Sequence, residues 1–339
     1  MEKNKDNCTL LCVWKKGDLI VMEGRIAYLD FIRGFAILTV IVGHLIQYNY
    51  SSSIENVLFD IIYSFHMPLF FFVSGCTRAL NVNIVSSVTG LIKIILKKFC
   101  LLIIPSIIWT LFVPFFFVKD YAFICNSISG YWFLNVLFVV VTFWETFSFL
   151  LYKIKIRFLL YIIVFGGILV LFILGIKRIS LFYLMMYVLG FYFQKYAFLY
   201  KIHNYIYMAL FLAFCICSPY FDYGNTTLGN PDRIWLLIPL SICASFSLMR
   251  IFACCEINYK SQLSFLGFIG NYTLGIYLSH FIFVKLPFVT YWETGVNMGI
   301  QFIILLLIAL CISFICIGIE RLIVFYPELH RLMYGRNYK

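Results

Sequence analysis

The chain has 339 residues, of which 63% are hydrophobic and only 12% are charged, whereas a soluble domain carries about 25% charged residues. A water-soluble fold could not bury this much apolar surface, so we predict an integral membrane protein with lipid as its solvent. The excess of 26 Lys and Arg over 15 Asp and Glu fits cytoplasmic loops better than a nucleic-acid partner, because no soluble segment combines clustered basic and aromatic residues.

Apolar segments long enough to span a membrane follow one another along the whole chain. A spanning helix needs about 20 mainly apolar residues. Breaking the sequence at its polar clusters gives ten segments: 29–49, 57–77, 99–118, 131–151, 157–175, 179–194, 204–220, 234–252, 268–288 and 298–319. The predicted fold class is therefore all-α, a polytopic bundle of ten transmembrane helices.

The basic residues of the loops orient this bundle. If the N-terminus is cytoplasmic and all ten segments cross, 21 of the 26 Lys and Arg lie inside and five lie outside. The positive-inside rule then predicts that both termini face the cytoplasm. We expect a cytoplasmic segment at 1–24 without a removable signal peptide, a membrane domain at 25–320 and a cytoplasmic tail at 321–339. The expected location is the inner (plasma) membrane.

The first segment carries three polar residues on one face. Arg33 and His44 fall within about 20° of each other and about 16 Å apart along a helix, and Asp30 falls within about 40° of His44. An ionisable residue inside a bilayer is costly and by default marks a functional pathway. The structural alternatives are an Asp30–Arg33 ion pair at the interface and a core histidine bonded to a backbone carbonyl.

The second segment places another histidine in the membrane. His66 directly precedes Met67 and Pro68, and proline distorts a helix and frees a carbonyl for other partners. Because the second segment would run antiparallel to the first, we expect His66 and His44 at comparable depth. His280, in the ninth segment, also lies in the predicted outer half.

Two carboxylates and three lysines add to the candidates. Glu145 lies inside the fourth segment and Glu320 ends the tenth, where each either serves a site or only neutralises an Arg or Lys. Lys93, Lys97 and Lys98 cluster at the predicted cytoplasmic mouth of the third segment. They suit phosphate binding, and equally contact with anionic lipid or topology signalling.

Two motifs carry a resemblance to a known family. The spacing R-x3-L-D-x2-R-G-x9-H at 25–44, followed by F-H-M-P-L-F-F-F-V-S-G at 65–75, resembles the opening signature of acyltransferase family 3. Trp132-Phe133-Leu134 and the sequence G-x4-G-I-Y-L-x-H at 270–280 are similar to its later motifs, in the expected order. The resemblance covers roughly residues 25–320.

The resemblance implies a ten-helix membrane O-acyltransferase that moves an acyl group, commonly acetyl from acetyl-CoA, to a carbohydrate hydroxyl at or across the membrane. By motif match, His44 corresponds to the family's essential histidine, and Asp30 and Arg33 correspond to its paired Asp and Arg. Four further residues are candidates for the site: His66, Ser74, Glu145 and His280. The donor would be held by Arg33, Lys93, Lys97 and Lys98. Expected partners are membrane lipid, acyl-CoA, a carbohydrate acceptor and glycan-assembly proteins, without nucleic acid.

Two features depart from the family's pattern. Near the third segment the family often has two arginines three apart before a proline, whereas Lys98 and Leu101 precede Pro105 here. This weakens the transfer of a CoA-binding role. Some members also carry an esterase-like soluble domain after the membrane part, whereas this chain ends about 20 residues beyond the tenth segment. Transfer is then expected to finish on the bundle or with a partner.

The chemistry assigns different tasks to the two ends of the first helix. Transfer from a thioester to a hydroxyl needs a base, and imidazole is the natural one near neutral pH. We predict that His44 is the general base or transiently carries the acyl group, and the sequence does not separate the two. Arg33, nearer the cytosol, is better placed to meet the donor's phosphates or pantetheine, with Asp30 orienting it.

A transporter or flippase for a lipid-linked sugar or small solute is the main rival function. Intramembrane charge, glycine and a proline break suit it as well, but no inverted repeat or pair of broken helices in two halves is evident. A purely structural membrane subunit ranks third, because it would not need three histidines and a charged stripe. The twelve cysteines lie mostly in apolar runs without CxxC pairs, so we predict neither a disulfide framework nor a metal site.

Overall fold

The computed structural model describes residues 26–49, 56–80, 85–117, 131–154, 157–173, 178–221, 234–285 and 298–336, and every regular element in these ranges is helical. The α-helices are α1 (Ala27–Asn49), α2 (Val57–Tyr63), α3 (His66–Leu80), α4 (Val88–Lys98), α5 (Ile104–Phe117), α7 (Trp132–Lys153), α8 (Arg157–Ile173), α9 (Arg178–Lys195), α10 (Phe198–Lys201), α11 (Asn204–Cys217), α13 (Ile234–Asn271), α14 (Thr273–Ser279), α15 (Phe281–Val284), α16 (Met298–Ile323) and α17 (Pro327–Tyr334).

The described helices confirm an all-α protein built for a membrane. Within these ranges, five helical segments are long and apolar enough to span one, and a bent pair formed by Ser261–Asn271 and Thr273–Val284 would make a sixth. The count of ten spans and the orientation of both termini stay predictions.

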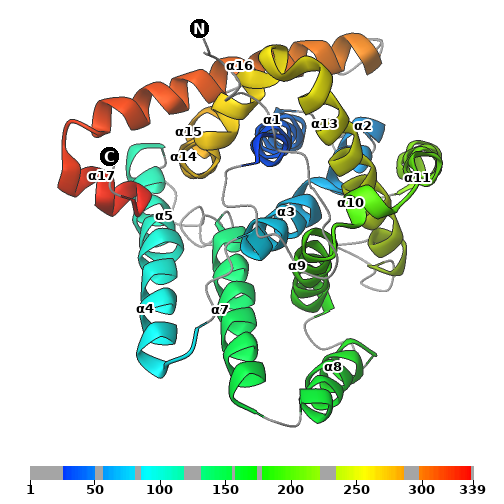
Figure 1. Cartoon of the computed structure of the whole chain (residues 1–339). Helices are drawn as coiled ribbons and strands as arrows, with labels where there is room; N and C mark the ends of the chain where they lie inside the picture. Colours follow the sequence, from blue (N-terminus) through cyan, green and yellow to red (C-terminus); the bar gives the residue numbers. More distant parts are fainter. Residues whose placement is uncertain are drawn as a thin grey trace, which may run out of the picture.

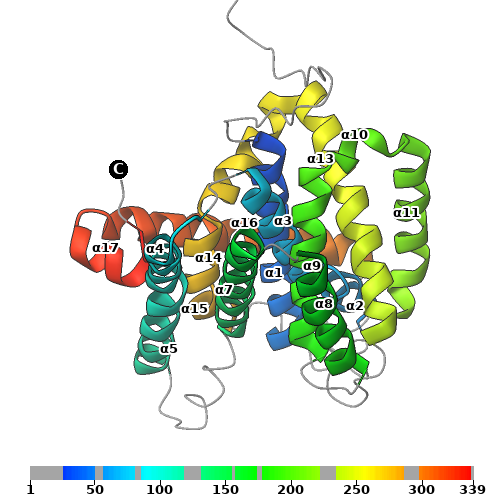
Figure 2. The ribbon, with the colours of Figure 1, turned by 60° about the horizontal axis from the view of Figure 1, so that its bottom comes forward.

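Helix α1 lies at the centre of the bundle. Figure 1 draws it nearly end-on among α3, α13, α14 and α16, and its apolar residues Ile32, Ile37 and Ile41 are fully buried. Figure 2 shows α11 at one edge of the molecule and α17, beside α4 and α5, at the other. On α11, Met208 is 72% exposed, as expected for a side chain that faces lipid rather than protein. On the polar stripe of α1, Asp30 is buried, whereas Arg33 and His44 are half-buried.

Glycines let pairs of helices approach until their backbones touch. A Cβ atom on Gly75 of α3 would lie 1.9 Å from the Tyr187 carbonyl oxygen of α9, and one on Gly190 of α9 would lie 2.0 Å from the Phe72 carbonyl oxygen of α3. Gly34 of α1 meets the backbone of α13 in the same way. Close contact through small residues is a main source of helix association in membranes.

Replacing these glycines should destabilise the bundle. Gly75→Ala and Gly190→Ala each put a methyl group into a neighbouring backbone, and overpacking of this kind costs about 1–3 kcal/mol. Gly166→Ala on α8 and Gly318→Ala on α16 are matched controls, since nothing lies within 4 Å of a Cβ atom there. Thermal unfolding of the purified variants in detergent measures the difference. Equal midpoints for both sets would contradict the close packing.

Proline explains the break between α2 and α3. Pro68 has no N–H to bond with the carbonyl four residues earlier, on Ser64, and the helix is interrupted at Ser64 and Phe65. The Ser241 hydroxyl of α13 donates a hydrogen bond to that free Ser64 carbonyl at 2.7 Å. The sequence-based expectation of a freed carbonyl with another partner is thus confirmed.

Three element boundaries differ from those predicted. The predicted segment 99–118 begins earlier, at Val88, and passes through a π-helical turn at Phe99–Ile103. Pro105, just after this turn, has no N–H to donate to the preceding turn, which accounts for the irregular hydrogen bonding. The polar stretch predicted to separate 252 from 268 is helical inside α13, with a kink at Tyr259. The predicted segment 268–288 is instead divided at Tyr272, where the helices bend by 54°.

Candidate active site

Three histidines from different parts of the chain meet around Tyr63. His44 lies near the end of α1, His66 begins α3, and His280 lies between α14 and α15. The ring centroids of His44 and His280 are 5.4 Å apart, and those of Tyr63 and His66 are 4.7 Å apart. The Tyr63 hydroxyl is 3.4 Å from His44 Nδ1. These four residues form the histidine cluster, which unites the three histidines singled out from the sequence; their chemical roles stay predictions.

Hydrogen bonds to the backbone define the tautomers of two of these rings. His66 Nδ1 lies 2.8 Å from the Ile62 carbonyl oxygen, and His280 Nδ1 lies 2.7 Å from that of Tyr277. A carbonyl only accepts, so both Nδ1 atoms carry the proton and both Nε2 atoms are acceptors. His280 is completely buried, and its Nε2 has no hydrogen-bond partner among the described residues.

Asp30 and Arg33 form the ion pair that their spacing allows. Arg33 Nη1 donates to Asp30 Oδ1 at 2.7 Å, and Arg33 Nη2 donates to the Thr77 hydroxyl of α3 at 2.5 Å. The Arg33 side chain is 26% exposed, so its charge is accessible as well as paired. Along α1 it lies about 16 Å from His44. The pair and the histidine cluster therefore occupy separate levels of the central helix.

A groove opens beside Asp30, between the start of α1 and the end of α13. Its volume is about 300 Å³, its polar walls include Asp30, Ser264 and Asn271, and its apolar walls include Phe31 and Phe268. The groove therefore exposes Asp30 of the ion pair to open space, at the opposite end of α1 from the histidine cluster.

A second, buried ion pair lies close to the first. Arg78 Nε and Nη2 donate to the two carboxylate oxygens of Glu145 at 2.5 and 2.9 Å, and the Glu145 side chain is only 2% exposed. Lys98 interacts electrostatically with Glu145, Lys97, Arg78 and Arg33. The basic cluster is defined by these four cations: Arg33, Arg78, Lys97 and Lys98. Glu145, a candidate from the sequence, thus neutralises Arg78 of the basic cluster.

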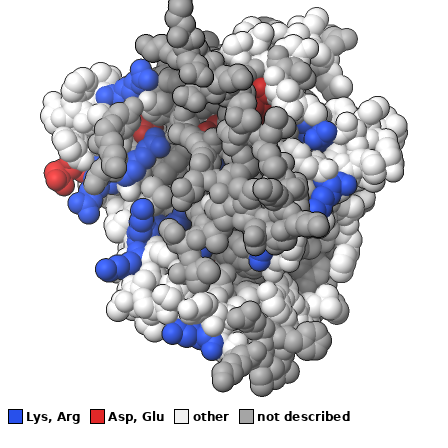
Figure 3. Space-filling view, in the orientation of Figure 1, with Lys and Arg blue, Asp and Glu red and all other residues white. Residues whose placement is uncertain are grey.

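The lysines of α4 and Ser74 differ in exposure, and Lys93 and Ser74 belong to neither cluster. Lys93 and Lys97 are exposed on α4, and Lys98 is half-buried. Ser74 is half-buried on α3, about 12 Å along the helix from His66. Figure 3 shows Lys and Arg at several places on the face seen in Figure 1, with few Asp and Glu. A polyanionic ligand would find favourable charge on this face.

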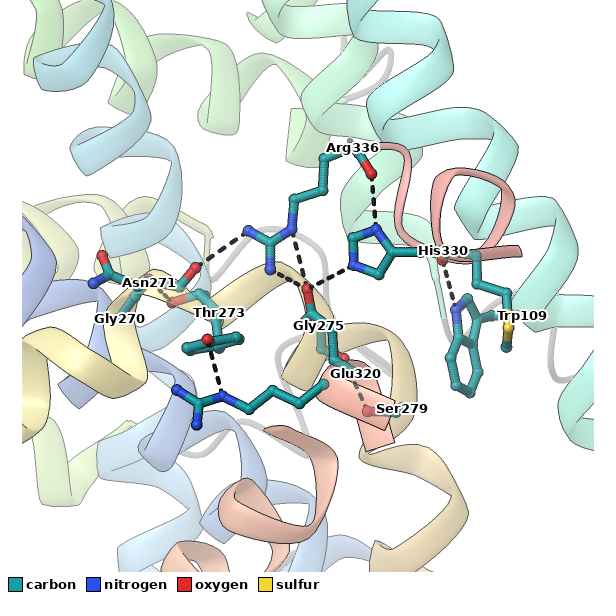
Figure 4. Close-up of polar contacts among 12 residues, drawn as sticks. Trp109, Gly270, Asn271, Thr273, Gly275, Ser279, Glu320, His330 and Arg336 are labelled. Carbon is teal, nitrogen blue, oxygen red and sulfur yellow. Dashed lines mark hydrogen bonds and ion pairs between the residues drawn. The ribbon is translucent and has the colours of Figure 1, made fainter. Parts of the chain in front are cut away.

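Glu320 anchors the C-terminal helix to the break between α13 and α14. Arg336 donates to the fully buried Glu320 carboxylate and to the Asn271 carbonyl oxygen, and His330 Nε2 lies 3.5 Å from Glu320 Oε1 (Figure 4). A Cβ atom on Gly275 would clash with this carboxylate. Glu320 therefore joins α14, α16 and the segment after α17.

The comparison with protein families decides the identity. The model of the acyltransferase domain, acyltransferase family 3, matches residues 26–318. The chain belongs to acyltransferase family 3. No curated protein and no solved structure matches it. As a family 3 member with several apolar helices that could span a bilayer, the protein is a membrane acyltransferase. The family match does not support the alternative of a transporter or flippase.

Several contacts of this family 3 acyltransferase were not predicted from its sequence. Arg78 entered the sequence analysis only as one of the 21 basic residues expected inside, and its partner on α7 follows from tertiary packing. Tyr63 and Gln47 were not singled out, although they stand three residues before His66 and three after His44. Spacing of three or four residues within one predicted segment, next to a candidate catalytic residue, is the signal that could have found them. Arg25, the first residue of the motif, lies outside the described residues.

Proposed function

We propose that the protein transfers an acetyl group from acetyl-CoA, bound on the cytoplasmic side, to a hydroxyl of a surface polysaccharide or lipid-linked sugar. The observation that carries this proposal is the division of the central helix into two levels. Cations gather around Arg33 at one level, and imidazoles gather around His44 at the other. A donor that carries phosphates at one end and a thioester at the other suits such an arrangement.

The level around Arg33 binds the phosphates of the donor. Phosphate oxygens accept strong hydrogen bonds from guanidinium and ammonium groups. Arg33 keeps part of its surface accessible although it is paired with Asp30, and the exposed Lys97 and half-buried Lys98 lie on α4 beside it. Asp30 orients Arg33, and Lys93 extends the positive surface along α4.

Acyl transfer to the acceptor takes place at the level around His44. The acceptor hydroxyl attacks the thioester carbonyl, its proton passes to a base, and the CoA thiol leaves. His44 supplies the base, or carries the acyl group between the two half-reactions. His280 and His66, with Nε2 atoms able to accept protons, are the further acid–base groups of this level.

Radiolabelled acetyl-CoA and membrane vesicles that contain the full-length protein test this function. Label should pass into vesicle glycans only when the protein is present. The double substitution Lys97→Gln and Lys98→Gln should raise the KM for acetyl-CoA by about tenfold, the value of one charge-assisted hydrogen bond, with little change in acceptor dependence. The effect should shrink at high salt, where exposed charges are already screened.

A matched pair of lysines separates donor binding from general surface charge. Lys153→Gln with Lys195→Gln removes two exposed cations that the sequence assigns to the same side, and its KM should equal that of the wild type. If the Lys97 and Lys98 variant also saturates like the wild type, these lysines are topology signals only. A wild-type protein that neither labels glycans nor releases CoA would overturn the proposed function itself.

A further inference from the structure

Gln47 lies one turn after His44 on α1 and bonds with its ring. Gln47 Oε1 is 2.9 Å from His44 Nδ1. The same oxygen is 2.9 Å from the Tyr63 hydroxyl of α2, which donates to it. One amide oxygen therefore joins the candidate catalytic imidazole to a neighbouring helix.

Tyr63 is held in place by a close contact with α1. A Cβ atom on Gly43 would lie only 2.9 Å from Tyr63 Cε2, so the phenol ring rests against the backbone beside His44. The ring also packs edge-on against His66, 4.7 Å between centroids, and against Phe59 at 4.0 Å. These contacts position the hydroxyl, and through it the Gln47 oxygen.

The hydrogen-bond geometry assigns the proton on His44. The single Tyr63 hydroxyl proton goes to Gln47 Oε1 at 2.9 Å rather than to His44 Nδ1 at 3.4 Å. The bond between Nδ1 and the same amide oxygen then requires a proton on Nδ1, because an amide oxygen only accepts. Nε2 is left as the basic nitrogen, as it is in His66 and His280.

We propose that Gln47, supported by Tyr63, is a positioning residue that holds His44 in the Nδ1–H tautomer and directs Nε2 to the reacting hydroxyl. This inference rests on the proposed function, in which His44 acts as base or acyl carrier. A neutral amide orients the imidazole without the negative charge that would stabilise its protonated form. The titratable groups around His44 are Tyr48 on α1, Tyr63 on α2, His66 on α3, His280 after α14, and Lys285 after α15.

Two replacements of the exposed Gln47 distinguish a role in orienting the His44 ring from a role in side-chain packing. Gln47→Leu removes the acceptor, and kcat for acetyl transfer in the vesicle assay should fall about 10-fold to 100-fold, part of the 10²–10⁴ that a general base contributes. The KM for acetyl-CoA should stay unchanged, because Arg33, the proposed donor-binding residue, lies about 21 Å away along α1. Gln47→Glu keeps the acceptor, so it should restore most of kcat. Its charge favours the imidazolium, and the acid limb of the pH–rate profile should move to higher pH.

Nitrogen-15 NMR of histidine-labelled protein reads the tautomer without any turnover. The wild type should show a protonated Nδ1 on His44, and Gln47→Leu should show a mixture of tautomers. Gln262→Leu, an exposed glutamine that contacts Ser261 on α13, is the matched control and should change neither spectrum nor kcat.

The outcomes distinguish this inference from the function on which it rests. A wild-type His44 with an unprotonated Nδ1, or a Gln47→Leu variant with wild-type kcat and pH profile, would overturn the positioning role while acetyl transfer stands. A wild type without acetyl transfer would overturn the proposed function and this inference together.

Discussion

His44→Ala should abolish acyl transfer while the protein still inserts and folds. The imidazole belongs to the histidine cluster, and its Nδ1 is bonded to Gln47. Loss of a general base typically reduces the rate by about 10²–10⁴-fold. The expected result is a drop of that size in kcat for label transfer from acetyl-CoA, with the KM for acetyl-CoA nearly unchanged because the basic cluster is intact.

A second histidine provides the control for this result. His203 is exposed before α11, far from the cluster in the chain, and His203→Ala should transfer acetyl groups at the wild-type rate. Size-exclusion profiles of both variants check that each one is folded. Acylation at the wild-type level in His44→Ala would remove this residue from the mechanism.

Glu145→Ala should be among the most destabilising single changes in the bundle. The Glu145 carboxylate accepts two hydrogen bonds from Arg78 and is 2% exposed. Breaking a buried ion pair by removing one partner costs about 3–5 kcal/mol, because a buried charge loses its compensation. Arg33 and Lys98 add further positive charge nearby. A lower thermal midpoint in detergent and a reduced folded yield are the expected results.

Removing both partners should recover most of this loss. Arg78→Met combined with Glu145→Leu replaces the pair by apolar groups, a change that is often neutral or stabilising in buried sites. Glu328→Ala removes an exposed carboxylate on α17 and should leave the midpoint unchanged. If Glu145→Ala unfolds like the wild type but transfers no acetyl, the carboxylate serves chemistry rather than the ion pair.

The helices that periodicity predicted well are those with simple apolar sequences. The predicted 29–49, 131–151 and 298–319 correspond to α1, α7 and α16 within a few residues at each end. The interruption before α3 was also predictable, because Pro68 frees a carbonyl on its own helix. A proline acts locally, so its effect can be read from the chain.

The break at Tyr272 had no such local signal. No proline stands near it, and the freed Asn271 carbonyl is bonded by Arg336, 65 residues later in the chain. The polar stretch after residue 252 was predicted as a loop because it is not apolar, yet it continues α13. An apolar composition indicates which segments can lie in lipid, but it does not mark every helix. A polar segment can also be helical, provided that its backbone groups are hydrogen-bonded.

The sequence by itself determined the solvent, the all-α class and the family, and it singled out the candidates for the chemistry: Asp30, Arg33, His44, His66 and His280. These follow from composition, periodicity and motif spacing, which belong to single segments of chain. The tertiary structure alone decided the partners on other helices, namely Glu145 with Arg78, Glu320 with Arg336, and Gln47 with Tyr63. The physical reason is that a partner on another helix depends on the depth and rotation of both helices. Those are set by close contacts such as Gly75 against α9 and Gly43 against Tyr63, and no single segment contains them.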